Sequence, residues 1–408
     1  MDPISFEKAQ DIHFSLNLPE LKIIQKSIYK AFGEILVEDI FCKKSLPAFD
    51  NSAMDGYALR LSDLKKDIKI KGRILAGENA LGLEILDGEC MKVMTGAMIP
   101  KGTEVVVPFE NVQLKNDEYI EVLGDFKSNA NIRFKGEEKS IGEILAKKGD
   151  RLTHGLIGLI ASQGINNVEV YQKVKIAVYS SGDEIIEPGE NAQEHQIYNI
   201  NAVSIIALLH SYGYDAQYLG VLKDDSDMLQ KAIQTFHQHD IVITSGGASV
   251  GEADFFEKAL KKCGADIKYH GINIKPGKAI MLGTLKQTFI CSLPGNPLSA
   301  IINLNTMILP MIQRLSGANR FYPKPIFAKL KNPIRVKNGR VNMILGRYSN
   351  GEFEAYKGGK YGSNAISTIE ECDSIAIIGE KVSEIQEELK ILPYVMEFSD
   401  TMLDIINE

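Results

Sequence analysis

Strand-like apolar runs alternate with helical patterns between residues 174 and 316. We expect strands at Val174–Tyr179, Ala216–Leu222, Ile241–Thr244, Ala279–Leu282 and Phe289–Leu293. We expect helices at Asn201–Tyr212, Ser226–His237, Glu252–Cys263 and Asn296–Leu315. This alternation predicts a parallel sheet that carries helices on both faces. Such sheets bind ligands beyond the carboxyl ends of their strands.

Polar and glycine-rich motifs follow the expected strands at that end. They are Ser180–Glu184, Lys223–Asp225, Thr244–Gly247 and Leu293–Pro297. Because the carboxyl ends of parallel strands meet at one edge, we expect these motifs to surround one crevice.

The motif after the central strand is a serine- and glycine-rich turn that opens onto a helix. Such a turn points backbone N–H groups outward, beside the positive end of a helix dipole, and so suits a phosphate or another oxyanion. Gly246, Gly247 and Gly251 permit positive φ and close backbone approach. The alternative is a tight strand–helix connection that binds nothing, since glycine turns are common.

Three acids, Glu184, Asp225 and Asp254, stand at expected strand ends or in the loops that follow. Clustered carboxylates beside a phosphate site are typical of Mg²⁺, which prefers oxygen ligands. The alternative is that each acid caps a helix or is a solvated loop residue. We favour a metal or substrate site for the three together.

Two lysines lie on the stiff turn Lys275-Pro-Gly-Lys278. Ammonium groups fixed in this way would neutralise a dianionic ligand, whereas the alternative is an exposed basic turn. Leu293–Pro297, with two prolines and a glycine, predicts a rigid turn just ahead of a helix.

Composition limits the class of protein. The chain has 408 residues, 44% hydrophobic and 24% charged, which predicts two to four globular domains. Its net charge of −7 argues against a nucleic-acid binder. Five scattered cysteines without a C-x-x-C pair suggest neither disulfides nor structural zinc. We see no signal peptide and no apolar run of membrane-spanning length, so we expect a cytoplasmic protein that does not engage a membrane.

The flanking regions read differently from the α/β segment. Residues 5–40 have helical spacing with a cap at Ser5, and Ile68–Val122 contains short strand-like runs between glycine turns. We therefore expect four domains. They are an elongated helical or mixed domain (1–44 plus 140–172), an inserted β-rich domain (45–139), the α/β domain (173–319) and a small C-terminal β-barrel or sandwich (320–408).

Seven motifs occur in an order, and at separations, that resemble one family. They are Phe49–Ala58, Met94–Ala97, Gly136–Glu138, Ser181–Glu184, Thr244–Gly251, Lys275–Lys278 and Leu293–Pro297. Together they resemble the molybdopterin molybdenumtransferases, which include bacterial MoeA and the E domain of gephyrin. The resemblance extends over essentially the whole chain. Thr244–Gly251 alone would also fit molybdopterin adenylyltransferases and CinA-like proteins.

The resemblance implies a MogA-like central domain, a C-terminal β-barrel and the last step of molybdenum cofactor synthesis. Adenylylated molybdopterin would bind, molybdate would be inserted at its dithiolene sulfurs, and AMP would leave with the help of Mg²⁺. The resemblance also implies a homodimer whose cleft joins the α/β domain of one subunit to the inserted domain of the other. Transient partners would be a molybdopterin adenylyltransferase and the acceptor molybdoenzymes.

The resemblance also assigns site residues. It implies catalytic roles for Asp55, Glu184, Asp225 and Asp254, of which the last three would hold the metal. It implies substrate-binding roles for Thr95, Ser245, Gly246, Gly247, Ser249, Lys275, Lys278, Pro294, Gly295 and Pro297, and for the C-terminal serines Ser363 and Ser367, of which it leaves open which one reaches the site.

Three positions depart from the family pattern, namely Ala248, Ala279 and Glu138, where Val, Pro and Asp are usual. None of them removes a charge, and they leave the choice between molybdate and tungstate open. Two other functions compete with the implied one. An adenylyltransferase would need only the α/β region, so the flanking domains argue against it. An oligomeric scaffold with a lapsed site is disfavoured by the intact acids and lysines.

Overall fold

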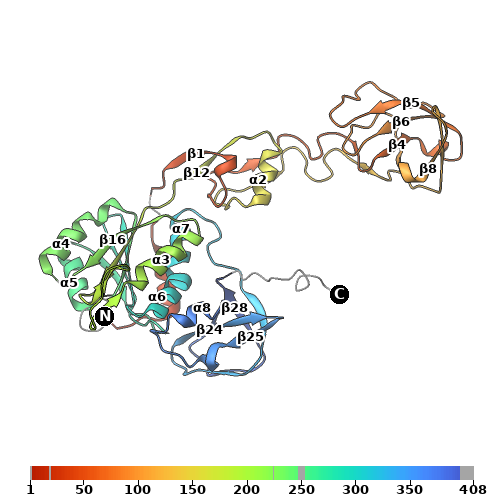
Figure 1. Cartoon of the computed structure of the whole chain (residues 1–408). Helices are drawn as coiled ribbons and strands as arrows, with labels where there is room; N and C mark the ends of the chain where they lie inside the picture. The colour runs from red at the N-terminus through yellow and green to blue at the C-terminus, as the bar shows by residue number, and fades with distance from the viewer. Residues whose placement is uncertain (1, 18–19, 224, 247–252, 396–408) are drawn as a thin grey trace. The chain divides into compact units, whose positions relative to one another are not determined.

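The computed structural model describes residues 2–17, 20–223, 225–246 and 253–395 (Figure 1). These residues form two compact units, which we describe separately. The first contains Met1–Val37, Lys148–Thr153 and Asn167–Glu408, and the second contains Glu38–Lys147 and His154–Asn166.

A six-stranded sheet forms the centre of the α/β region of the first unit. Its strands follow the order β16 (Ala216–Leu222), β13 (Ile176–Ser181), β17 (Ile241–Ser245), β21 (Thr288–Leu293), β20 (Met281–Leu285) and β18 (Asp266–His270). The first four run parallel. β20 pairs antiparallel with both of its neighbours.

The prediction of a wholly parallel sheet was therefore wrong at β20. Only two residues separate β20 from β21, and a parallel neighbour needs a crossover of a dozen residues or more. β18 was not predicted, and it is a five-residue edge strand with only two buried side chains.

Helices cover both faces of this sheet, which confirms the predicted doubly wound arrangement (Figure 1). On β13, Ile176 and Val178 pack in a core with α3 (Ile200–Ser211), α6 (Pro297–Asn303) and α7 (Leu309–Leu315). The alternate residues Ala177 and Tyr179 pack with α4 (Ser226–Thr235) and α5 (Ala253–Lys262). The strand period of two separates the cores.

The predicted helix Asn296–Leu315 contains a π-helical segment, Leu304–Ile308, between α6 and α7. Pro310 has no N–H group to donate to the carbonyl four residues earlier, so a regular α-helical ladder cannot continue there. The π segment takes up this irregularity, and π-bulges often occur near functional sites.

The C-terminal part of the first unit is a closed barrel, which confirms that prediction. Its ring of strands is β24 (Val341–Ser349), β25 (Glu352–Ala355), β22 (Ile326–Leu330), β28 (Glu388–Pro393) and β26 (Ser374–Ile378), which returns to β24. Phe353 and Ile391 are fully buried inside it. β19 (Ile274–Lys275), from the α/β segment, pairs with β24 and so joins the lysine turn to the barrel. Short elements accompany the ring, namely β23 (Ile334–Arg335), β27 (Glu384–Ile385), η6 (Tyr356–Gly359) and α8 (Ser367–Glu370).

The N-terminal segment packs on the α/β core. α1 (Phe6–Ser15) begins as predicted, with Ser5 Oγ accepting the N–H of Lys8 at 3.1 Å. The helical spacing expected as far as residue 40 was wrong, because the chain continues as β1 (Ile23–Ser27), η1 (Ile28–Lys30) and β2 (Ile40–Phe41). β1 pairs with β12 (Asn167–Tyr171) along its whole length.

The second unit is rich in β-structure, as predicted. Its main sheet has the order β7 (Val105–Pro108), β4 (Gly56–Leu59), β6 (Glu89–Val93), β5 (Ile68–Ile74), β9 (Tyr119–Val122) and β8 (Val112–Asn116). Further elements are β3 (Asn51–Ser52), β10 (Ile132–Arg133), β11 (Ile144–Ala146) and α2 (His154–Ala161). No described helix has both the length and the apolar character needed to cross a membrane.

Candidate functional site

Three of the predicted motifs meet at the carboxyl edge of the α/β sheet. The Asn201 side-chain amide donates to Ser245 Oγ and to the Gly295 carbonyl, each at 2.7 Å. Gly246 has φ +95°, and a Cβ there would lie 2.3 Å from the Ser181 carbonyl oxygen. Only glycine fits this close approach. The structure therefore brings together the strand-end loops that carry Ser181, Ser245, Gly246 and Gly295.

The three predicted acids lie in different settings. Glu184 is exposed in the loop after β13. Asp225 caps α4, because one of its oxygens accepts the N–H groups of Asp227 (3.0 Å) and Met228 (2.8 Å). The capping alternative thus holds for that oxygen. Asp254 falls in the first turn of α5, and its side chain is outside the described part, as are Gly247 and Ser249.

The acids offer oxygen donors of the kind that Mg²⁺ prefers. Glu184 and Asp225 are both exposed and follow the neighbouring strands β13 and β16. Within the described ranges, no three His, Cys, Asp or Glu side chains form a metal-ligand cluster. Carboxylates of the Glu184 and Asp225 kind fit such a metal, and the side chain of Asp254, the third predicted ligand, lies outside the described part.

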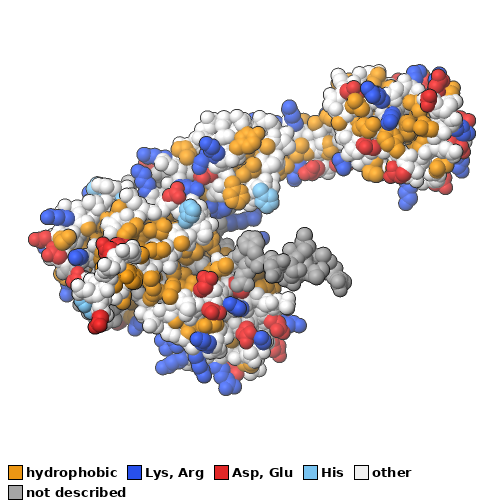
Figure 2. All heavy atoms as spheres, in the orientation of Figure 1, with side chains coloured by type: hydrophobic (Ala, Val, Ile, Leu, Met, Phe, Trp, Pro, Cys, Tyr) orange, Lys and Arg blue, Asp and Glu red, His pale blue; other side chains and the backbone are white. Residues whose placement is uncertain are grey.

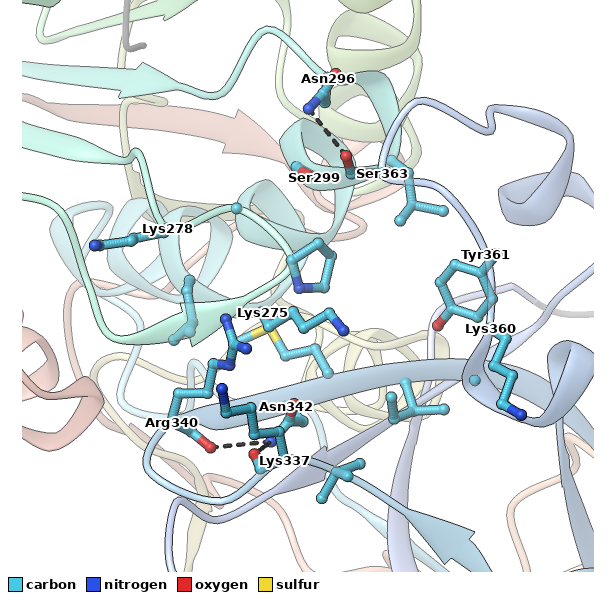
Figure 3. Close-up of a pocket in the computed structure, with 18 of the residues that line it drawn as sticks. Lys275, Lys278, Asn296, Ser299, Lys337, Arg340, Asn342, Lys360, Tyr361 and Ser363 are labelled. Atoms are coloured by element: carbon cyan, nitrogen blue, oxygen red, sulfur yellow. Dashed lines mark hydrogen bonds between the residues drawn. The ribbon is translucent and has the colours of Figure 1, made fainter. Parts of the chain in front are cut away.

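A cavity of about 550 Å³ lies between the α/β segment and the barrel within the first unit (Figure 3). The Lys275–Lys278 turn, Pro294, Asn296 and the barrel line it. Its described lining has no Asp or Glu but six positively charged residues: Lys275, Lys278, Arg335, Lys337, Arg340 and Lys360. Arg335 is ion-paired with Glu384 at 2.8 Å, outside the lining. Figure 2 shows Lys and Arg side chains along the lower edge of the barrel, with Asp and Glu side chains on the rest of its visible face. A concave surface with this charge favours anions.

The backbone around both predicted lysines is well anchored. Lys275 pairs with Asn342 through β19 and β24. The Lys278 carbonyl accepts the N–H groups of Ile272 and Ile280, at 3.0 and 3.1 Å. Both lysines are exposed, and both line the cavity.

Of the two predicted serines, Ser363 contacts the cavity and Ser367 does not. Ser363 lines the cavity, and its Oγ accepts the side-chain N–H of Asn296 at 2.9 Å. Ser367 is the exposed first residue of α8 and is not part of the lining. Of the predicted turn residues 294, 295 and 297, only Pro294 contacts the cavity.

Tyr361 also lines the cavity and was not predicted from the sequence. Its hydroxyl oxygen accepts the N–H of Leu345 at 2.7 Å, which leaves its own hydrogen to donate. Burial raises the pKa of Tyr361 to about 12, so this donor stays neutral at physiological pH. Figure 3 shows the Tyr361 hydroxyl pointing into the same space as the Lys275 ammonium group.

In the second unit, the structure brings together the two residues predicted there. Thr95 donates to one oxygen of Asp55 through its backbone N–H (2.7 Å) and its hydroxyl (2.8 Å). These hydrogen bonds, the backbone one first, hold the pKa of Asp55 below its usual value. Asp55 is exposed, so its ionised carboxylate is available to a ligand.

Comparison with known proteins covers most of the chain. Residues 4–164 match the MoeA N-terminal region (domain I and II), and residues 177–314 match the probable molybdopterin binding domain. A molybdopterin molybdenumtransferase from Haemophilus influenzae is 38% identical over 84% of this chain and 86% of its own length. The chain belongs to the molybdopterin molybdenumtransferase family.

Other members of the molybdopterin molybdenumtransferase family agree. The enzyme of that name from Staphylococcus aureus (strain MSSA476) is 30% identical over 79% of this chain and 78% of its own. The solved structure of the moeA protein from Pyrococcus horikoshii OT3 covers 96% of this chain and 100% of its own, with 26% identity and a TM-score of 0.80.

Four cavity cations were missed by the sequence analysis: Arg335, Lys337, Arg340 and Lys360. In this molybdopterin molybdenumtransferase family member they lie beyond residue 314, outside both matched regions. The basic turn Lys337-Asn-Gly-Arg340 was the available local signal. Its place at the cavity depends on the pairing of β19 with β24, which joins residues more than 60 positions apart.

Proposed function

We propose that this chain inserts molybdate into adenylylated molybdopterin, releasing AMP and giving Mo-molybdopterin. Membership of the molybdopterin molybdenumtransferase family places the chain in molybdenum cofactor biosynthesis as an enzyme. The observation that carries the proposed reaction is the cation-lined cavity beside Pro294 and the Lys275–Lys278 turn.

The substrates explain the charge of this cavity. Molybdate is a dianion, and the adenylate carries phosphates, so both need fixed positive or N–H donors and no covalent nucleophile. Lys275 and Lys278 neutralise one anion from the α/β side, and Arg340 and Lys360 supply charge from the barrel. Tyr361 adds a neutral, directional donor. Fixed donors around the anions lower the cost of reorganisation during reaction.

The acids at the strand ends have a separate role. Glu184, Asp225 and Asp254 would hold Mg²⁺, which would stabilise the negative charge that develops on the departing AMP. Ser245 and Gly246 form the turn that orients the phosphates, and Asn201 fixes this turn to Gly295. Asp55, with Thr95, would complete the cleft from the partner subunit of a homodimer.

The setting of the proposed reaction is the cytoplasm, where the chain would receive adenylylated molybdopterin from an adenylyltransferase and pass its product to molybdoenzymes. The relatives' names and the absence of a membrane-spanning helix in the described ranges are compatible with this.

AMP release by the purified protein tests the proposal. Adenylylated molybdopterin should yield AMP only when molybdate and Mg²⁺ are both present. Lys275→Ala and Lys278→Ala should weaken substrate binding and make the remaining affinity less dependent on salt, because each removes a screened attraction to phosphate. Lys286→Ala is the matched control, since Lys286 lies in the β20–β21 turn and outside the cavity.

Two results would contradict the proposal. One is AMP release that needs neither molybdate nor Mg²⁺. The other is an unchanged affinity and salt dependence in both lysine variants. Formation of adenylylated molybdopterin from ATP would instead support the adenylyltransferase alternative.

A further inference from the structure

The turn that carries Lys275 and Lys278 rests on a buried amide. Asn303, the last residue of α6, is 0% exposed, and its Nδ2 donates to the Gly277 carbonyl at 2.9 Å. Gly277 has φ +89°, and a Cβ there would lie 2.2 Å from Asn303 Nδ2. The turn backbone therefore lies directly on the amide. In the part of the chain that the structure describes, this is the only side-chain hydrogen bond to residues 275–278.

α6 connects this amide to the rest of the cavity. The helix begins at Pro297, directly after the loop that carries Pro294 and Asn296. Ser299, which lines the cavity, precedes Asn303 by four residues, so both lie on one face of the helix. Asn303 also borders the π-helical segment Leu304–Ile308.

Asn303 lowers the stability of the fold more than an apolar residue would at this position. Its Oδ1 is buried and has no hydrogen-bond partner in the described structure. An unpaired buried oxygen destabilises a fold, and an apolar side chain would avoid this penalty. The hydrogen bond from Nδ2 to Gly277 is what the amide provides in return.

We propose that Asn303 is a positioning residue that acts through the lysine turn. Its amide fixes the Gly277 carbonyl and so holds Lys275 and Lys278 at the cavity, ready for an oxyanion. The inference rests on the proposed function, in which these lysines bind the anionic substrates. A turn that is ordered before binding loses less conformational entropy when the anion arrives.

Asn303→Leu removes the donor and keeps a side chain of similar size, and Asn303→Ala is a second variant in case the first does not fold. The matched control is Asn305→Leu, in the adjoining π segment. Asn305 is 7% exposed, its buried Nδ2 has no hydrogen-bond partner in the described structure, and it makes no hydrogen bond to the turn. All variants are made in the full chain and checked by thermal melting.

Two measurements are needed. Hydrogen exchange of peptides covering residues 272–282 reports the order of the turn, and calorimetric titration with molybdate reports anion affinity. We expect faster exchange and a three- to tenfold weaker affinity, about the effect of one hydrogen bond, in the Asn303 variants alone. In a Lys275→Ala/Lys278→Ala background, Asn303→Leu should weaken molybdate binding no further.

The outcomes separate the positioning role from the proposed function. Unchanged exchange in both Asn303 variants overturns the positioning role, whatever the activity. Faster exchange with unchanged molybdate affinity also overturns the positioning role. The same holds if Asn305→Leu changes exchange and affinity as much as the Asn303 variants do. If the double lysine variant binds molybdate as tightly as the unmodified chain, the proposed lysine site itself fails and the positioning role fails with it.

Discussion

At the scale of single residues, the two units hold their ionisable groups in different ways. In the second unit, Asp55 is exposed but accepts two hydrogen bonds from Thr95. In the first unit, the cavity gathers cations without a carboxylate among its described lining residues. The first arrangement keeps one acid ionised, and the second attracts anions from solution.

Asp55→Asn should change how stability depends on pH. Thr95 holds the folded-state pKa of Asp55 below its ordinary value of 3.8, so the contribution of Asp55 is fully present above about pH 4 and is lost as pH falls through the folded-state pKa. The stability gap between the unmodified chain and the variant should therefore narrow below about pH 4. Urea unfolding from pH 3 to 7 measures it. A gap that stays constant over this range would show that the hydrogen bonds to Asp55 have no effect on folding.

Tyr361→Phe removes the acceptor for the Leu345 N–H and the neutral donor at the cavity. We expect a loss of about 1–3 kcal/mol in stability from the unpaired N–H, together with weaker molybdate binding. Tyr356→Phe is the control, since its ring is 6.2 Å from that of Tyr361 but does not line the cavity. Equal molybdate affinity in the two variants would exclude the Tyr361 hydroxyl as a ligand.

Local sequence predicted some residues at the cavity and not others. Lys275 and Lys278 could be found because a Pro-Gly turn restricts them within four residues. Arg335 and Lys360 could not, because both follow the α/β segment in sequence and reach the cavity only once the barrel packs beside it. The family resemblance alone pointed to Asp55, and a single exposed Asp has no pattern of its own.

At the scale of elements, α1 is held on the α/β core by polar contacts. His13 is buried, and its Nε2 lies 2.8 Å from the Tyr269 hydroxyl, which belongs to β18. Arg314, in α7, donates to the carbonyls of His13, Phe14 and Leu16 at the end of the helix. A cation placed there also complements the helix dipole.

This contact should make the first unit sensitive to mild acid. Burial, and secondarily Arg314, lowers the pKa of His13 from 6.5 to about 4. In the unfolded chain His13 binds a proton below about pH 6.5, whereas in the folded chain it does so only below about pH 4. The free energy of unfolding is therefore highest above about pH 6.5 and falls as the pH is lowered from 6.5 to 4. The loss is about 3 kcal/mol. Urea midpoints at pH 7 and 4.5 should show this excess loss relative to His13→Phe, and equal losses would contradict it.

The elements predicted correctly from the sequence were the longer ones, in which apolar residues recur several times at the spacing of a strand or a helix. β16 was placed with its exact bounds, and α4 began at the predicted residue. β18 and the antiparallel direction of β20 were missed, because a five-residue edge strand and a two-residue connection leave little periodicity to read. Helical spacing also misled the prediction after Ser15, where short strands share the same composition.

At the scale of the whole molecule, the proposed cleft shared between subunits makes activity depend on the dimer. Asp55→Ala and Asp225→Ala homodimers should both be inactive, because every cleft lacks one residue. A heterodimer of the two variants would contain one intact cleft, and it should recover about half the activity if the clefts act independently. Purified heterodimer carrying two tags is assayed for AMP release. A heterodimer as inactive as its parents would place both residues in the same subunit.

The hydrogen bonds from Arg314 to the end of α1 have a consequence for synthesis of the chain. His13 and its partner Arg314 are 301 residues apart. A ribosome that adds about 5–20 residues each second needs roughly 15 s to 1 min to synthesise the chain from His13 to Arg314. During this interval the whole second unit, which ends at Asn166, is translated and can close its own sheet. Over this interval the nascent chain therefore carries a helix whose Ala9 and His13 are not yet covered, and a chaperone could protect it.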